Sequence, residues 1–302
     1  MPEIIHQAKS PVLVAITDRI RYVDARFQAE QLVKEYGLKV VDMPLLIQSM
    51  NNQPKIREAV RPIWADTLTG EYQGLRGEDR SYEAWHSIGS LTTAEGLKKA
   101  FSKIGEYGFM PIPDDEWIKV GKGQYDGKKI VRVHLEDARK GKVPTPGTPY
   151  CISVRLDKDN TTINPRKRLY YDSFMRDDRV LMIAGSPDCR EALAKILFGK
   201  KEEDDKGWTT VGSYHRINDV DSSKKPKGRL ACLNSDNDGL DGDHSADVNG
   251  RFVGIGARGA VGEKISAPQL ITGLPLEVVV GILENPDLNR AGMIEAAKAY
   301  RP

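Results

Sequence analysis

The chain has 302 residues, of which 39% are hydrophobic and 29% are charged, an ordinary balance for one large folded domain or two average ones. The chain has 45 lysines and arginines and 43 acidic residues, and its net charge of +2 gives no general reason to expect nucleic-acid binding. No apolar run approaches the ~18 residues that cross a bilayer, and the first ten residues lack the apolar core of a signal peptide. We therefore expect synthesis in the cytoplasm and no membrane partner.

The first segment, residues 1–50, is predicted to be an αβ unit. Residues 12–17 form an apolar run, as in a buried strand, and residues 39–42, which include Val40 and Val41, are a second candidate strand. Between them Tyr22, Ala25, Ala29 and Leu32 recur at helical spacing. The pattern predicts a strand, a helix ending near Tyr36 and a second strand.

The second segment, residues 51–90, has a weak pattern with many charges and with glycines at positions 70, 74 and 77. We expect an extended or loop-rich arm with one short helix near residues 55–64. A segment that buries little apolar surface alone usually needs a partner surface. Such an arm would be completed by a neighbouring molecule.

The remainder, residues 91–302, is predicted to be an α+β core. Thr92 and Glu95 form a capping box for a helix that stops before Gly108. Alternating residues predict half-buried strands at 128–135 and 150–156, and two further strands at 228–233 and 250–255. Residues 274–300 predict two helices. His134 lies in the first of these strands, where a structural role is expected.

The three cysteines, Cys151, Cys189 and Cys232, are odd in number and lie far apart without CxxC spacing. This spacing predicts neither a disulfide framework nor a zinc site. We expect three small buried thiols.

The best-specified local pattern begins at Arg179. Residues 180–184 are a continuous apolar run that favours a buried strand, which Gly185 ends. Ser186 then caps a helix that has Pro187 in its first turn, and a second strand follows before Ile217. One interpretation is a capped helix packed on a sheet. The alternative is a phosphate site, because amides at a helix start bind phosphate; its residues would be Ser186, Asp188 and Cys189.

An acidic loop spans residues 234–249. Asn234, Asp236, Asp238 and Gly239 match the first half of a calcium-binding loop, but Ser245 replaces the bidentate glutamate that closes it. Two interpretations remain open. Either the loop is a solvated hairpin tip and the protein has no cofactor, or it holds calcium through four carboxylates: Asp236, Asp238, Asp241 and Asp243.

A small basic cluster consists of Arg166, Lys167 and Arg168, beside two tyrosines. A solvated loop explains it, and contact with nucleic-acid phosphates is the alternative.

The order of these features over residues 179–262 resembles the later part of tailed-phage major coat proteins. The resemblance is carried by Arg179, the apolar run, Ser186 and Pro187 with their helix, and then by Gly212, Arg216, Ile217, Val220 and residues 250–262. It implies a phage-capsid-like fold, a place in the virion and no catalytic site.

We therefore expect an α+β fold with mixed sheets, short amphipathic helices and long loops. The first functional hypothesis is a non-enzymatic structural subunit of a symmetric shell, whose partners are copies of itself. The alternative is an α/β enzyme or sensor that binds a phosphorylated ligand near Ser186, with a divalent metal in the acidic loop.

Overall fold

The computed structural model describes residues 3–5, 12–63, 65–105, 108–156, 167–198, 208–211, 225–234, 239–241 and 249–257. The chain divides into two units, Met1–Gly256 and Ala257–Pro302, and the elements below belong to the first except for the last residue of β17. The helices predicted over residues 274–300 lie outside the described residues. Helices and mixed sheets confirm the predicted α+β class. None of the described helices is long and apolar enough to span a bilayer.

The largest sheet in the described residues has the order β10-β11-β6-β5-β14-β15-β13-β12, with β7 paired to β14. Its β10–β11 and β13–β15 pairings are parallel and the other pairings are antiparallel. The strands are β5 (Ala65–Arg76), β6 (Asp79–His86), β7 (Met110–Pro111), β10 (Val131–His134), β11 (Tyr150–Arg155), β12 (Lys167–Tyr170), β13 (Trp208–Val211), β14 (Lys227–Asn234) and β15 (Gly239–Asp241).

A second sheet has the order β1-β2-β17-β4 and includes the predicted strands near residues 12–17 and 39–42. Two short pairs complete the β-structure, β3 with β16 and the hairpin of β8 with β9. The bounds are β1 (Glu3–Ile5), β2 (Val12–Ile16), β3 (Ile20–Arg21), β4 (Lys39–Val40), β8 (Gln124–Tyr125), β9 (Lys128–Lys129), β16 (Asn249–Gly250) and β17 (Val253–Ala257).

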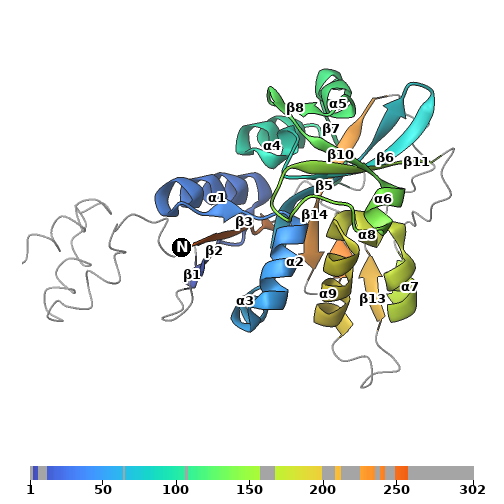
Figure 1. Ribbon diagram of the computed structural model, residues 1–302. Coiled ribbons are helices and arrows are strands. Elements are labelled where there is room, and N and C mark those ends of the chain that lie inside the picture. Colours follow the sequence, from blue (N-terminus) through green and yellow to red (C-terminus); the bar gives the residue numbers. More distant parts are fainter. Residues whose placement is uncertain are drawn as a thin grey trace, which may run out of the picture. The chain divides into compact units, whose positions relative to one another are not determined.

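Helices cover both faces of the strands β5, β6 and β11 (Figure 1). On one face, Tyr72 stacks on Trp85 at 3.9 Å beneath α1, α4 and α5. On the other face, Tyr82 and Ala84 pack against α6 and α8. The helices are α1 (Tyr22–Tyr36), α2 (Met43–Asn52), α3 (Pro54–Val60), α4 (Ala94–Phe101), α5 (Asp114–Gly121), α6 (Leu135–Arg139), α7 (Tyr171–Arg176), α8 (Asp178–Ala184) and α9 (Pro187–Phe198), with a 3-10 turn η1 (Ser90–Thr92).

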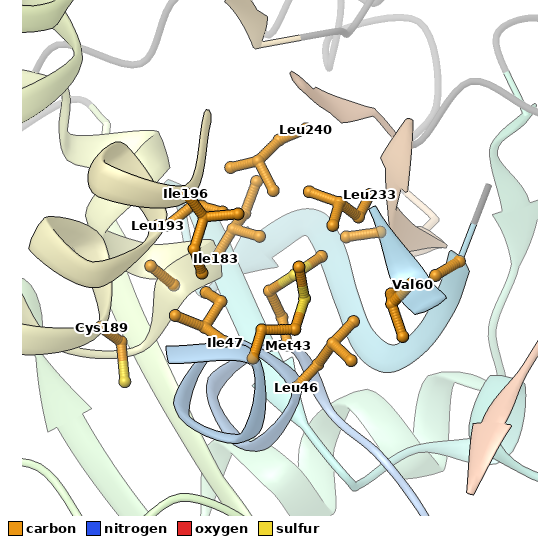
Figure 2. Close-up of a cluster of buried hydrophobic side chains, with 14 of the residues drawn as sticks. Met43, Leu46, Ile47, Val60, Ile183, Cys189, Leu193, Ile196, Leu233 and Leu240 are labelled. Atoms are coloured by element: carbon orange, nitrogen blue, oxygen red, sulfur yellow. The ribbon is translucent and has the colours of Figure 1, made fainter. Parts of the chain in front are cut away.

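A third cluster of buried side chains fills the space between α2, α3, α8, α9 and the strands β14 and β15. Figure 2 shows Met43, Leu46 and Ile47 of α2 facing Leu193 and Ile196 of α9. Apolar burial of this extent is the main favourable contribution to folding, at about 25 cal/mol per Å².

The prediction of an arm over residues 51–90 is wrong. After α3, this segment forms the β5–β6 hairpin, whose strands are central in the sheet and mostly buried. The pattern misleads because Thr67, Thr69, Glu71 and Gln73 are polar yet almost fully buried. A polar side chain can be buried when neighbouring groups satisfy it, and Thr67 and Glu71 have partners 164 and 108 residues away in the sequence.

The predicted strand over residues 180–184 is also wrong, because these residues form the helix α8. Asp177 caps it by accepting a hydrogen bond from the Val180 amide at 3.1 Å, and Gly185 ends it with φ +86°. Every residue of α8 is buried. A short apolar run without a polar face does not distinguish a buried helix from a buried strand.

A buried ion cluster joins α8 to the hairpin. Glu71 of β5 accepts hydrogen bonds from the Arg179 guanidinium, from the Nη2 of Arg229 at 2.9 Å and from the Tyr82 hydroxyl at 2.5 Å. Burial alone raises the pKa of Glu71, but the two arginines outweigh this effect and set the pKa to about 2. Arg229 also stacks over the Phe109 ring at 4.5 Å. One carboxylate thus ties together β5, β6, β14 and α8.

The Glu71→Gln variant is expected to lose about 3–5 kcal/mol of unfolding free energy, because it leaves two buried guanidiniums without their carboxylate. Urea denaturation measures the loss. The matched control is Glu191→Gln, which removes an exposed carboxylate paired with Lys195 and should leave the midpoint unchanged. Equal midpoints for the two variants would contradict the role given to Glu71.

His86 stands in a buried hydrogen-bonded chain on the same face. The Met43 amide donates to the Thr69 hydroxyl at 2.9 Å, which lies 2.9 Å from His86 Nδ1, while Nε2 lies 3.1 Å from the Met182 carbonyl oxygen. Burial lowers the pKa of His86 to about 3. The ring is therefore neutral in the folded protein at any pH near neutrality.

This histidine should make the protein sensitive to mild acid. An unfolded histidine binds a proton below about pH 6.5, whereas folded His86 does not until about pH 3, so stability falls as pH falls through this window. The unfolding free energy should drop by about 1.4 kcal/mol per pH unit for this one proton. Denaturation series between pH 6.5 and 5 should show a flatter dependence of the unfolding free energy on pH for His86→Gln than for the parent protein. The control His134→Gln, at an exposed position, should show the same dependence as the parent. A slope that His86→Gln leaves unchanged would refute the assignment.

Candidate anion-binding site

A pocket of about 440 Å³ lies on the face of the large sheet that carries Trp85. Its lining residues belong to β5, β6, β10 and β11 and to the end of α5. The lining residues are Arg76, Ser81, Gly121, Arg132, Val133, His134, Ser153, Val154 and Arg155. We call it the arginine pocket.

Strand register brings its polar residues to one face. Arg132 lies opposite Cys151, and His134 lies opposite Ser153. Ser153 in turn lies opposite Glu83 of β6, two residues from the Arg155–Ser81 pair. Since side chains alternate along a strand, all these residues share one face of the sheet.

Glu83 is fully buried and binds two of the arginines that line the pocket. Arg76 binds it in a bidentate manner, with Nε and Nη2 at 2.8 and 2.9 Å, and Arg132 Nη2 binds at 3.2 Å. The Trp85 indole N–H donates at 2.7 Å. Burial raises the pKa of Glu83, but the hydrogen bonds and charges of the arginines outweigh it, so the pKa lies below its ordinary value. Glu83 therefore stays ionised and fixes two guanidiniums.

The other contacts orient the arginines further. Arg76 lies over the Trp117 ring at 3.7 Å and donates to the Trp117 carbonyl oxygen. Arg155 is half exposed and forms an ion pair with Asp79 at 3.5 Å. Three guanidiniums thus meet two carboxylates, which leaves an excess positive charge. Planar guanidinium groups bind carboxylate and phosphate oxygens well, so the arrangement suits an anion.

At the start of α9, where a phosphate site was predicted, the side chains of Ser186 and Cys189 make contacts within the protein. The Ser186 hydroxyl accepts a hydrogen bond from the Cys189 amide at 3.0 Å, and Asp188 lies in the first turn. Burial raises the pKa of the Cys189 thiol, whose Sγ lies 3.8 Å from the Pro44 carbonyl oxygen. Here the helix start is capped by its own serine, while phosphate binding stays a prediction.

The remaining predicted sites lie partly outside the described residues. Asp236, Asp238 and Asp243 are outside them, and Asp241 ends β15. Among the described residues no group of three acidic, histidine or cysteine side chains could hold a metal ion. Arg166 is also outside, while Lys167 and Arg168 begin β12 and pair with β13. Calcium and nucleic-acid binding therefore stay predictions.

Two expectations about single residue types are confirmed. Cys151, Cys189 and Cys232 are buried free thiols. His134 caps α6 by accepting a hydrogen bond from the Glu136 amide at 3.3 Å, which is the structural role expected. The structure adds that His134 also lines the arginine pocket.

Sequence reasoning missed the arginine pocket. Arg132 and Arg155 lie in two different predicted strands. In each strand, the alternation of side chains predicts which face the arginine occupies. Nothing local signals that Arg76, far away in the supposed arm, joins them over Glu83.

Comparisons with protein-family models and with curated proteins find no match for this chain. A comparison with solved structures finds a similar chain described as "Accommodation of massive sequence variation in Nanoarchaeota by the C-type lectin fold". The TM-score is 0.55 at 15% sequence identity, and the match covers 82% of this chain and 99% of the other. The likeness shows the fold: this chain has a C-type lectin-like architecture.

This finding overturns the resemblance of residues 179–262 to tailed-phage coat proteins. The similar structure has the C-type lectin fold, not a capsid fold. The first phrase of the resemblance fails as well, since its apolar run is the helix α8. The sequence resemblance arose from common residue types in a similar order and does not reflect a common fold.

The Ser186→Ala variant tests whether Ser186 only caps α9 or also binds phosphate. Loss of the cap should lower the unfolding free energy by about 1 kcal/mol. Ser102→Ala is the control, because the Ser102 hydroxyl donates to the Lys99 carbonyl oxygen at an exposed helix end. Thermal denaturation with and without inorganic phosphate should show the same phosphate response in both variants. A response lost only in Ser186→Ala would assign phosphate binding to this helix.

Proposed function

We propose that this chain is a binding protein that holds an anionic ligand in the arginine pocket. The observation that carries the proposal is the convergence of Arg76, Arg132 and Arg155 around one cavity, two of them fixed by a buried carboxylate. A cavity of about 440 Å³ is within the usual range for small-ligand sites. The positions of these charges are set before the ligand arrives, which reduces the entropy lost on binding.

The chemistry of the pocket favours recognition over proton transfer. Arginine remains protonated at any physiological pH. Glu83 has a pKa below its ordinary value, and both of its oxygens accept hydrogen bonds from guanidinium groups. A carboxylate held in this way is a poor base, so its role is to position the arginines.

The similar solved structure is consistent with a binding role. Its description attributes to the C-type lectin fold an accommodation of massive sequence variation. A fold that tolerates varied surfaces over a constant core can serve as a scaffold for different ligands. In this chain the core is held by internal ion clusters, so surface positions can differ at little cost to folding.

The shell hypothesis has lost the resemblance that motivated it. Assembly from copies of the chain, and the alternative of an enzyme or sensor with a divalent metal, stay predictions. The arginine pocket gives the anion-binding proposal a direct structural basis that neither of these has.

Inorganic phosphate and sulfate should raise the melting temperature of the protein, because a ligand that binds only the folded state stabilises it. Isothermal titration should show affinities reduced about tenfold in Arg132→Gln and in Arg155→Gln, since each removes a charged hydrogen-bond donor.

The matched control for these variants is Arg61→Gln, an exposed arginine at the end of α3 outside the pocket lining. It should bind both anions as the parent protein does. Anion binding that survives both pocket substitutions, or that Arg61→Gln reduces equally, would contradict the proposal.

A further inference from the structure

A second cavity, of about 560 Å³, adjoins the arginine pocket and shares Gly121 and Arg132 with it. It lies between the end of α5 and the β8–β9 hairpin. The other lining residues are Lys122, Gly123, Gln124, Gly127, Lys128, Lys129 and Ile130. Both linings are rich in basic residues, and we call the two adjoining cavities together the basic groove.

The basic groove follows the strand β10. Ile130 and Arg132 line the second cavity, and Arg132, Val133 and His134 line the first. Three residues of β10, together with Ile130 just before it, therefore contribute to the lining of the groove. In the described residues β10 ends the order of the large sheet, and Val131 is 49% exposed. An extended chain laid in the groove would run alongside an accessible edge strand.

The start of this edge is already in use, because the Ile130 amide, just before β10, donates to the Gly123 carbonyl oxygen. Within the described residues β10 itself has β11 as its one strand partner, so no strand lies beside its other edge there. Peptides commonly bind by adding a strand to such an edge.

The positive charges that line the groove favour an acidic ligand. Asp126 and Gly127 have φ values of +48° and +70°, which are typical of the tight turn of a two-residue hairpin. This turn presents Lys128 and Lys129, both exposed, beside the edge. Like charges discourage pairing of β10 with the same edge of another copy, whereas an acidic strand would be attracted.

Among the described residues neither lining contains tryptophan, tyrosine or phenylalanine, and His134 supplies the one aromatic ring. Single-stranded nucleic acids usually bind through bases stacked on aromatic rings as well as through phosphate contacts. The basic groove offers several positive charges and an edge strand, but only the His134 ring for stacking. This combination favours a peptide over a nucleic acid.

We propose that the basic groove binds an extended acidic peptide, which pairs with the edge of β10 and places alternate carboxylate side chains toward Arg132 and the lysines. The inference rests on the proposed anion-binding function and assigns the anion to the side chains of a peptide. Alternate residues of an added strand face the same side of the sheet, so acidic residues at every second position fit best.

Fluorescence anisotropy with a labelled octapeptide of alternating glutamate and threonine tests the inference. An isomer with the same residues in two blocks is the first control, and an oligothymidylate of equal charge is the second. We expect the alternating peptide to bind most tightly, and N-methylation of its backbone to weaken binding, because methylated amides cannot pair with a strand edge.

The double variant Lys128→Gln, Lys129→Gln should weaken peptide binding about tenfold while phosphate affinity stays at the parent value. Both lysines are exposed, so folding should be unaffected. The matched control is Lys99→Gln with Lys103→Gln, two exposed lysines near the end of α4.

Tighter binding of the oligothymidylate, equal binding of the block isomer, or no effect of the double variant would overturn the peptide inference, even if phosphate still binds the arginine pocket. Failure of phosphate itself to bind would instead overturn the proposed function. The two failures are therefore distinguishable.

Discussion

Two buried carboxylates on one hairpin hold the described structure together. Glu71 of β5 and Glu83 of β6 lie on opposite faces of the sheet, because Glu71 is opposite Ala84 and Glu83 is opposite Tyr72. Each carboxylate accepts hydrogen bonds from two arginines. An ionised group buried without partners would cost several kcal/mol, so each set of partners must be in place when the hairpin is buried. This constraint fixes the helices and strands on both faces relative to the hairpin.

The arginines around Glu71 and those around Glu83 differ in their access to solvent. This difference distinguishes a cluster that stabilises the core from one that can bind a ligand. The arginines that bind Glu71 are themselves buried, with side chains 0–2% exposed, so their charge is used inside the protein. Arg76 and Arg132 are 15% and 29% exposed, and they present guanidinium groups to a cavity while Glu83 holds them from below. The same type of interaction therefore serves as a core clamp on one face and as the base of a binding site on the other.

Local patterns predicted the parts of the fold that local forces determine. The helix from Tyr22 to Tyr36 and the strands β11 and β14 have clear periodicity, and the structure confirms them. The β5–β6 hairpin was missed because Thr67 and Glu71 look like surface residues until their partners are known. Arg229 lies 158 residues from Glu71 and Arg179 lies 108 residues away, so no local window contains the compensating charge. The arginine pocket was missed for the same reason.

Anion binding by this protein requires that Glu83 hold the arginine cluster in place before the anion arrives. A crystal structure of the protein grown with inorganic phosphate tests this claim most directly. We expect a phosphate ion within hydrogen-bonding distance of Arg132 and Arg155, with the Arg76–Glu83 pair intact. Phosphate bound at the Ser186 helix start while the arginine pocket holds no anion would contradict it.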